Sequence, residues 1–139
     1  LTELRCHIEG LAASKAVDNV QPEHMAQLKA LDAAMREAVA VADAEAYLNG
    51  NFQFHFLIYR LGASSYVLSI IEKLWVRVGP LIRFSLDDSG FKDSSRLHAQ
   101  VLRSLKTGDS SSLRQAICAD ITGAAHTIRS ARDAAQSWL

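Results

Sequence analysis

Asn51 and His55 lie four residues apart in the strongly apolar run from Leu48 to Leu61. A helix places residues four apart on the same face, so both polar side chains point in one direction. The rest of the run is apolar nearly all round, which is typical of a helix inside a bundle. A buried amide and imidazole need protein partners, water, a ligand or a metal. We therefore treat this pair as the first candidate site.

Two more polar residues interrupt apolar faces of other predicted helices. His98 precedes Val101 and Leu102 by three and four residues, and Asp120 lies close to the inward stripe that includes Ile117. Bundles build metal sites from side chains on facing helices, and imidazoles with a carboxylate suit zinc, nickel, manganese or iron. The alternative is that these polar residues only form hydrogen bonds in the core.

Several other charged residues have simpler interpretations. Arg5 and Glu9 have the i,i+4 spacing of a surface salt bridge. Arg83 follows Gly79-Pro80 and either binds an anion or is a solvated charge. His126 would be a good metal ligand by residue type, but it points roughly opposite the inward stripe of its helix, so we expect it at the surface.

Composition restricts the class of protein. The 139 residues are 49% hydrophobic and 22% charged, which predicts one globular domain. Fifteen basic and fifteen acidic side chains leave no excess of basic charge, which a nucleic-acid-binding domain would normally have. No apolar run is long enough to span a membrane, and no charged-then-apolar stretch suggests export. Cys6 and Cys118 lack metal-binding spacing, so we expect two buried thiols in a cytoplasmic protein.

The periodicity predicts an all-α, antiparallel bundle of about six helices and no strands. A central helix is expected over residues 43–61 and a long C-terminal helix over 110–137, with shorter helices near 1–17, 22–41 and 94–106 and one that begins near 64. Gly79-Pro80 predicts a kink or break, and residues 87–90 a loop. The first helix is expected to face inward through Leu4, Ile8, Leu11 and Ala12.

Three short motifs, in this order, resemble one known family. They are Leu4-Arg5-x-x-Ile8-Glu9, Asn51-x-x-Phe54-His55 and His98-x-x-Val101-Leu102-x-x-Leu105-x-x-Gly108-Asp109. Together they resemble the FadR-type C-terminal (FCD) domain of GntR-family bacterial transcription regulators. The resemblance extends over essentially the whole chain, residues 1–139, as a single domain.

The resemblance implies a ligand-sensing and dimerisation domain that controls an N-terminal winged-helix DNA-binding domain, expected upstream of Leu1. It implies a small effector, often a carboxylic acid, and a divalent metal held by one Asp and three His residues. Those four positions fall on Asn51, His55, His98 and Asp120, so the carboxylate has moved to another helix. The effector would also contact Asn51, His55 and His98.

The resemblance also gives a role to charged residues outside the metal set. Arg5 in the first helix corresponds to a cavity arginine of some members, so it is expected to contact the effector together with Arg83. Two other functions remain open. One is a metal-dependent enzyme, for which no second carboxylate is apparent, and the other is a purely structural dimerisation module.

Overall fold

The computed structural model describes residues 1–85 and 88–136. Its elements are α1 (Thr2–Ala16), α2 (Pro22–Ala40), α3 (Ala44–Gly62), α4 (Ser65–Ile82), the short 3₁₀ helix η1 (Arg83–Ser85), α5 (Asp88–Thr107) and α6 (Ser110–Gln136). Six α-helices, with no strand in the described ranges, confirm the predicted fold class. Residue 137, the expected end of the last helix, lies outside the described residues. No helix in the described ranges is long and apolar enough to cross a membrane.

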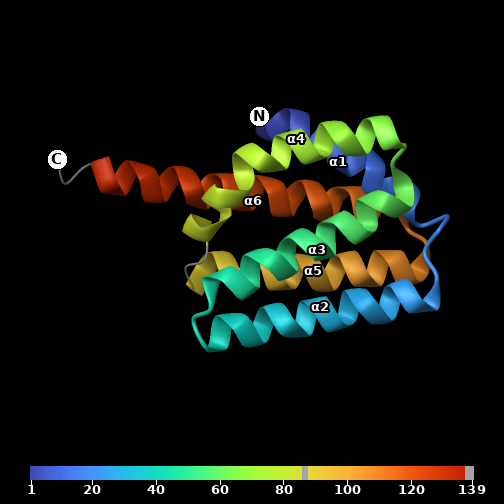
Figure 1. Cartoon of the computed structure of the whole chain (residues 1–139), viewed down its shortest axis with the longest axis horizontal. Helices are drawn as coiled ribbons and strands as arrows, with labels where there is room; N and C mark the ends of the chain where they lie inside the picture. Colours follow the sequence, from blue (N-terminus) through green and yellow to red (C-terminus); the bar gives the residue numbers. More distant parts are fainter. Residues whose placement is uncertain (86–87, 137–139) are drawn as a thin grey trace.

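Helix α3 contributes many of the fully buried side chains of the core and packs mainly against α1 and α2. Helices α1 and α2 both contact α3, while α5 and α6 contact each other, and α1 lies along α6. Figure 1 shows α3 and α5 in the middle of the molecule, with the far end of α6 extending beyond its neighbours. The core side chains of α3 include Phe54, Phe56 and Ile58, each 0% exposed. This arrangement brings the polar residues of α3, α5 and α6 into one interior.

Local sequence explains where several helices begin. The Asp43 side chain accepts a hydrogen bond from the Ala46 N–H at the start of α3, as the sequence predicts. Ser64 accepts one from the Val67 N–H at the start of α4. Gly108 has φ +71°, a left-handed conformation that favours glycine, and Asp109 then caps α6.

The inward face of α1 differs from the prediction. Ala12 is buried and Ile8 is half-buried against the core, as predicted, but Leu4 and Leu11 are 47% and 43% exposed. The other buried positions of α1 are Arg5, Glu9, Gly10, Ala13 and Ala16. Small residues on this face let α1 approach α3 closely, and a Cβ added at Gly62 would overlap the Ala12 carbonyl oxygen. Close backbone packing therefore decides the orientation of α1, which the apolar periodicity does not reveal.

A predicted loop and a predicted helix break are also wrong, whereas the alternative of a kink at Gly79-Pro80 stays a prediction. Helix α4 continues through Gly79 and Pro80 to Ile82, because a proline near a helix end removes one N–H donor while Val78 and Ile82 remain packed in the core. The predicted loop over residues 87–90 is helical from Asp88 onward, and residue 87 lies outside the described residues. Asp and Ser are common in turns but are also favourable at the start of a helix. Their presence therefore does not distinguish the predicted loop from the first turn of α5.

Candidate functional site

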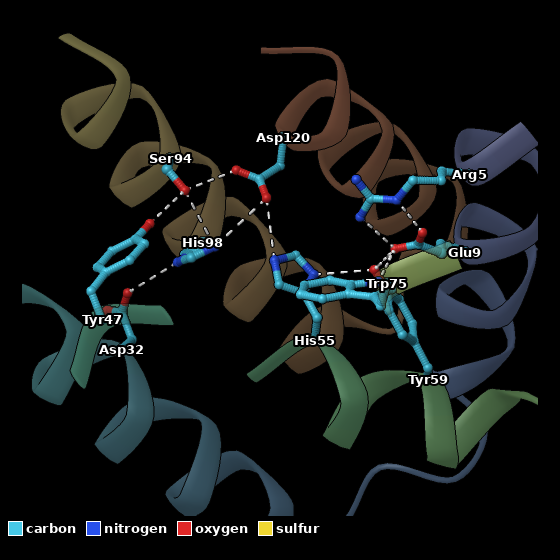
Figure 2. Close-up of polar contacts among 10 residues, drawn as sticks. All are labelled: Arg5, Glu9, Asp32, Tyr47, His55, Tyr59, Trp75, Ser94, His98 and Asp120. Atoms are coloured by element: carbon cyan, nitrogen blue, oxygen red, sulfur yellow. Dashed lines mark hydrogen bonds and ion pairs between the residues drawn. The ribbon is translucent and has the colours of Figure 1, made fainter. Parts of the chain in front are cut away.

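His55, His98 and Asp120 converge from α3, α5 and α6. The Nε2 atom of His55 lies 3.2 Å from Asp120 Oδ2, and Nε2 of His98 lies 3.8 Å from the same oxygen. One donor atom from each residue lies within 4.8 Å of the others, and both imidazoles are 2% exposed. Figure 2 shows the three side chains pointing toward a common point. The structure thus brings together three of the four residues in the predicted metal set.

Ser94 connects this cluster to the start of α5. Its hydroxyl donates a hydrogen bond to Asp120 Oδ1 over 2.9 Å and lies 3.5 Å from His98 Nε2. The Tyr47 hydroxyl donates to Ser94 Oγ over 3.4 Å. One oxygen of Asp120 is therefore occupied by Ser94, and the other faces the two imidazoles (Figure 2).

The second ring nitrogen of His98 faces another carboxylate. Its Nδ1 lies 3.8 Å from Asp32 Oδ1, and Asp32 is also paired with Arg36. A carboxylate behind an imidazole fixes the ring orientation and raises the basicity of the opposite nitrogen, as in many metal sites. Asp32 is only 3% exposed and lies one turn before the buried Met35 of α2.

The second ring nitrogen of His55 faces a hydroxyl. Its Nδ1 lies 3.2 Å from the Tyr59 hydroxyl, which donates to Glu9 Oε2 over 2.7 Å. Trp75 Nε1 donates to the same oxygen over 2.9 Å, and Arg5 binds Glu9 through Nε and Nη2 over 2.6 and 3.1 Å. Arg5 and Glu9 are 6% and 0% exposed, so the predicted surface salt bridge is in fact buried. Burial of Trp75 and Tyr59 above this pair excludes water from it.

The electrostatics of the cluster favour an ionised Asp120. Burial alone would raise the pKa of this carboxyl, but the imidazoles of His55 and His98, which face it, hold the pKa well below its ordinary value. Burial, followed by the negative charge of Glu9, raises the pKa of Tyr59 well above its usual value. The hydroxyl hydrogen of Tyr59 is therefore retained, and Asp120 presents a carboxylate to both rings.

A cavity of about 120 Å³ opens beside the cluster. Asn51, His55 and Asp120 line it, together with Arg5 and, at residue 126, a histidine that was expected at the surface. His126 is exposed, as predicted, although it also lines the cavity. Further lining residues include Tyr47, Trp75, Ser94, Leu97 and Thr127.

Of the residues predicted to contact the effector, four lie at or beside the cavity and one, Arg83, lies away from it. Asn51 and His55 line the cavity, and His98 lies against it through Ser94 and Asp120. Arg5 also lines it, although two of its guanidinium nitrogens are bonded to Glu9. Arg83 is exposed, with its guanidinium 5.9 Å from the Phe84 ring centroid, and it does not line this cavity.

The donor set fits a divalent metal. Two imidazole nitrogens and one carboxylate oxygen face one another, both imidazoles are buried, and each imidazole has a partner on its other nitrogen. This combination is typical of zinc and of other first-row divalent ions. Asn51 lines the same cavity and offers an amide oxygen as a further ligand. The residues present therefore suit the group that the sequence predicts.

With this geometry established, comparisons define the class of the domain. The FCD domain family model matches residues 1–123, so the chain belongs to the FCD domain family, and the resemblance predicted from the three motifs is confirmed. The chain is 26% identical over 120 residues to the HTH-type transcriptional regulator McbR of Escherichia coli (strain K12), covering 84% of this chain and 54% of McbR. It thus spans about half the length of this curated relative.

A solved structure supports the same fold. The E. coli McbR/YncC structure is similar with a TM-score of 0.84 and 24% identity, covering 92% of this chain and 65% of that chain. At this identity the likeness concerns the helical architecture alone. The curated relative is a regulator of transcription, which agrees with the predicted class of protein rather than with an enzyme.

Sequence reasoning does not find four residues that complete the site. Asp32 and Glu9 are hidden because charged residues at helical spacing are usually solvated, and both are in fact buried. Ser94 stands out only as a helix start, and Tyr59 only as part of an apolar run. The spacing of Tyr59, four residues after His55, is the one available signal, since it places a hydroxyl beside the ring.

Proposed function

We propose that this chain is the ligand-sensing domain of a transcriptional regulator, in which a divalent metal and a small effector share one buried cavity. The supporting observation is the convergence of His55, His98 and Asp120 beside the 120 Å³ cavity. These three residues, with Asn51, would hold zinc, nickel or manganese. A bound metal would supply positive charge and an attachment point for an anionic group.

The effector would be a small carboxylate. The cavity volume suits a molecule of a few non-hydrogen atoms, and its wall includes the Arg5 guanidinium. Two carboxylates, Asp32 and Asp120, lie beside His98, while the charge of Arg5 is balanced by Glu9. An anion therefore gains most when the metal is present, because the cation offsets this negative charge.

Signal transfer would follow from differential binding. The cluster joins α3, α5 and α6, so an occupant that contacts all three favours one arrangement of these helices over others. In the proposed full-length protein, a homodimer in the cytoplasm, that preference would change the affinity of a winged-helix domain for operator DNA.

Metal titration calorimetry tests the proposal. We expect one zinc ion to bind per wild-type chain, and affinity to fall at least 100-fold in His55→Ala and in His98→Ala, because each loses one of few ligands. His7→Ala is the matched control, since this exposed histidine lies on the outer face of α1. Equal zinc binding by all four proteins would overturn the metal assignment.

A thermal-shift comparison tests the effector class. Acetate, malonate and succinate are compared with acetamide, each with and without zinc, and ligand binding raises the melting temperature by mass action. We expect carboxylates to stabilise the zinc-loaded protein and acetamide to leave it unchanged. Stabilisation by none of the carboxylates under either condition would contradict the proposed effector class.

A further inference from the structure

Glu9 contacts neither imidazole of the cluster directly, yet it is 0% exposed and accepts four hydrogen bonds. Arg5 Nε and Nη2, the Tyr59 hydroxyl and Trp75 Nε1 all bond to its two carboxylate oxygens. Arginine and tryptophan nitrogens can only donate, so Glu9 can only accept from them. A buried carboxylate is costly to retain, and here the Tyr59 hydroxyl connects it to His55 (Figure 2).

The direction of the hydrogen bonds follows from the number of hydrogens. A tyrosine hydroxyl has one hydrogen, and that of Tyr59 is donated to Glu9 over 2.7 Å. Tyr59 oxygen can then only accept from the His55 ring, whose Nδ1 lies 3.2 Å away. Nδ1 of His55 must therefore hold a hydrogen, and in a neutral ring Nε2 has a free lone pair.

We propose that Glu9, acting through Tyr59, is the positioning residue that fixes His55 with its hydrogen on Nδ1 and presents Nε2 to the cavity. The inference deepens the proposed function, because Nε2 is the atom that the metal would bind. This positioning role explains why Glu9, a charged residue of α1, is buried against α3 and α4.

The opposite nitrogen shows the consequence of this arrangement. Nε2 of His55 lies 3.2 Å from Asp120 Oδ2, so a lone pair and a carboxylate oxygen would face each other. That contact is stable only when a proton or a metal ion lies between the two atoms. The Glu9–Tyr59 pair thereby prepares a position for a cation before any effector arrives.

Nitrogen-15 NMR of the metal-free domain tests the proposal directly. We expect the His55 Nδ1 resonance of the wild type to have the chemical shift of a protonated ring nitrogen. In Tyr59→Phe the acceptor for the His55 Nδ1 hydrogen is lost. In Glu9→Met the Tyr59 hydroxyl has no carboxylate to donate to, so its hydrogen is free to turn toward His55, and both variants should lose this fixed protonation. Tyr47→Phe is the matched control, because it removes a buried hydroxyl that contacts Ser94 and neither nitrogen of His55.

Zinc affinity provides the second readout. We expect zinc affinity to fall about 10- to 100-fold in Tyr59→Phe and Glu9→Met, the range typical of partners behind a ligand. Tyr66→Phe, at an 85% exposed position, should leave it unchanged. A merely structural role would lower the melting temperature of these variants without changing the Nδ1 chemical shift.

The outcomes separate this inference from the proposed function. An unprotonated Nδ1 in the wild type, or an Nδ1 chemical shift that is the same in wild type, Tyr59→Phe and Glu9→Met, would overturn the role of Glu9 even if zinc binds. A wild type that shows the expected Nδ1 shift and its loss in both variants, but binds no zinc, would contradict the metal site and leave the positioning role established.

Discussion

At the scale of single residues, the cluster differs from the pattern that the resemblance implies in the position of its carboxylate, which lies on α6 and not on α3. The resemblance expects a carboxylate at position 51 and an imidazole at position 120, whereas this chain has Asn51 and Asp120. Both line the same cavity, so one formal negative charge is retained beside His55 and His98. The position of that charge has changed, and its partners are now Ser94 and the two imidazoles.

Asn51→Asp tests this exchange. A second carboxylate should bind a divalent ion more strongly than an amide oxygen does, so zinc affinity should rise at least about tenfold. Without metal the same variant should unfold at a lower temperature, because two buried carboxylates repel each other in one cavity. Calorimetry and thermal denaturation of the metal-free protein check the two effects, with Asn49→Asp on the exposed face as the control. Unchanged affinity would place residue 51 outside the metal site.

Tyr47 gives a prediction about pH. Burial raises the pKa of Tyr47 to about 12, while the side-chain hydrogen bond with Ser94 lowers it in part. The unfolded chain releases this proton near the ordinary value of about 10, so the stabilisation is complete below that pH and is lost as pH rises toward 12. We expect the wild type to lose roughly 3 kcal/mol more unfolding free energy than Tyr47→Phe between these limits. Urea denaturation measures the unfolding free energy of both proteins at the two pH values. An equal loss in wild type and Tyr47→Phe would contradict the raised pKa of Tyr47.

At the scale of elements, small residues position α1 against the central helix. A Cβ added at Gly62 would overlap the Ala12 carbonyl oxygen and lie 2.8 Å from the Ala16 nitrogen, so side chains are excluded at this crossing. Gly50 similarly allows Met35 of α2 to pack on α3, since a Cβ there would lie 2.8 Å from Met35 Cγ. This explains why a glycine is retained inside α3 despite its cost to the helix.

Gly62→Ala tests the close approach. The added methyl must displace backbone, so unfolding free energy should fall by about 1–3 kcal/mol or more. Because α1 supplies Arg5 and Glu9, the His55 Nδ1 resonance should also shift. Gly123→Ala is the matched control, since no atom lies within 4 Å of its added Cβ, and it should stabilise α6 by up to about 1 kcal/mol. Urea denaturation measures the unfolding free energy of both variants. Equal stability of Gly62→Ala and Gly123→Ala would contradict the close packing of α1 on α3.

At the scale of the whole molecule, sequence periodicity is sufficient for the class of fold and for most helix positions. Helices α2, α3 and α6 begin within a residue of their predicted starts, because proline, aspartate and glycine signals mark those points. Periodicity fails where packing overrides apolarity, as on α1, where alanine and charged residues are buried and Leu4 and Leu11 are exposed. It also fails at Pro80, where neighbouring core contacts support the helix.

The candidate site is predictable in part for a similar reason. His55, His98 and Asp120 interrupt apolar stripes, and such interruptions are visible in a sequence. Their supporting partners are not, because Glu9 and Asp32 lie on helices whose buried faces are not strongly apolar. Contacts between α1 and α3 and between α2 and α5 bring them into place. Only the tertiary structure shows that these charges are interior.

The most direct test of the central claim is a crystal structure of the domain grown with one equivalent of zinc. Anomalous scattering at the zinc absorption edge locates the ion directly. The account predicts one strong peak within coordination distance of His55 Nε2, His98 Nε2 and Asp120 Oδ2. A zinc peak elsewhere, or an empty position between these three atoms, would contradict it.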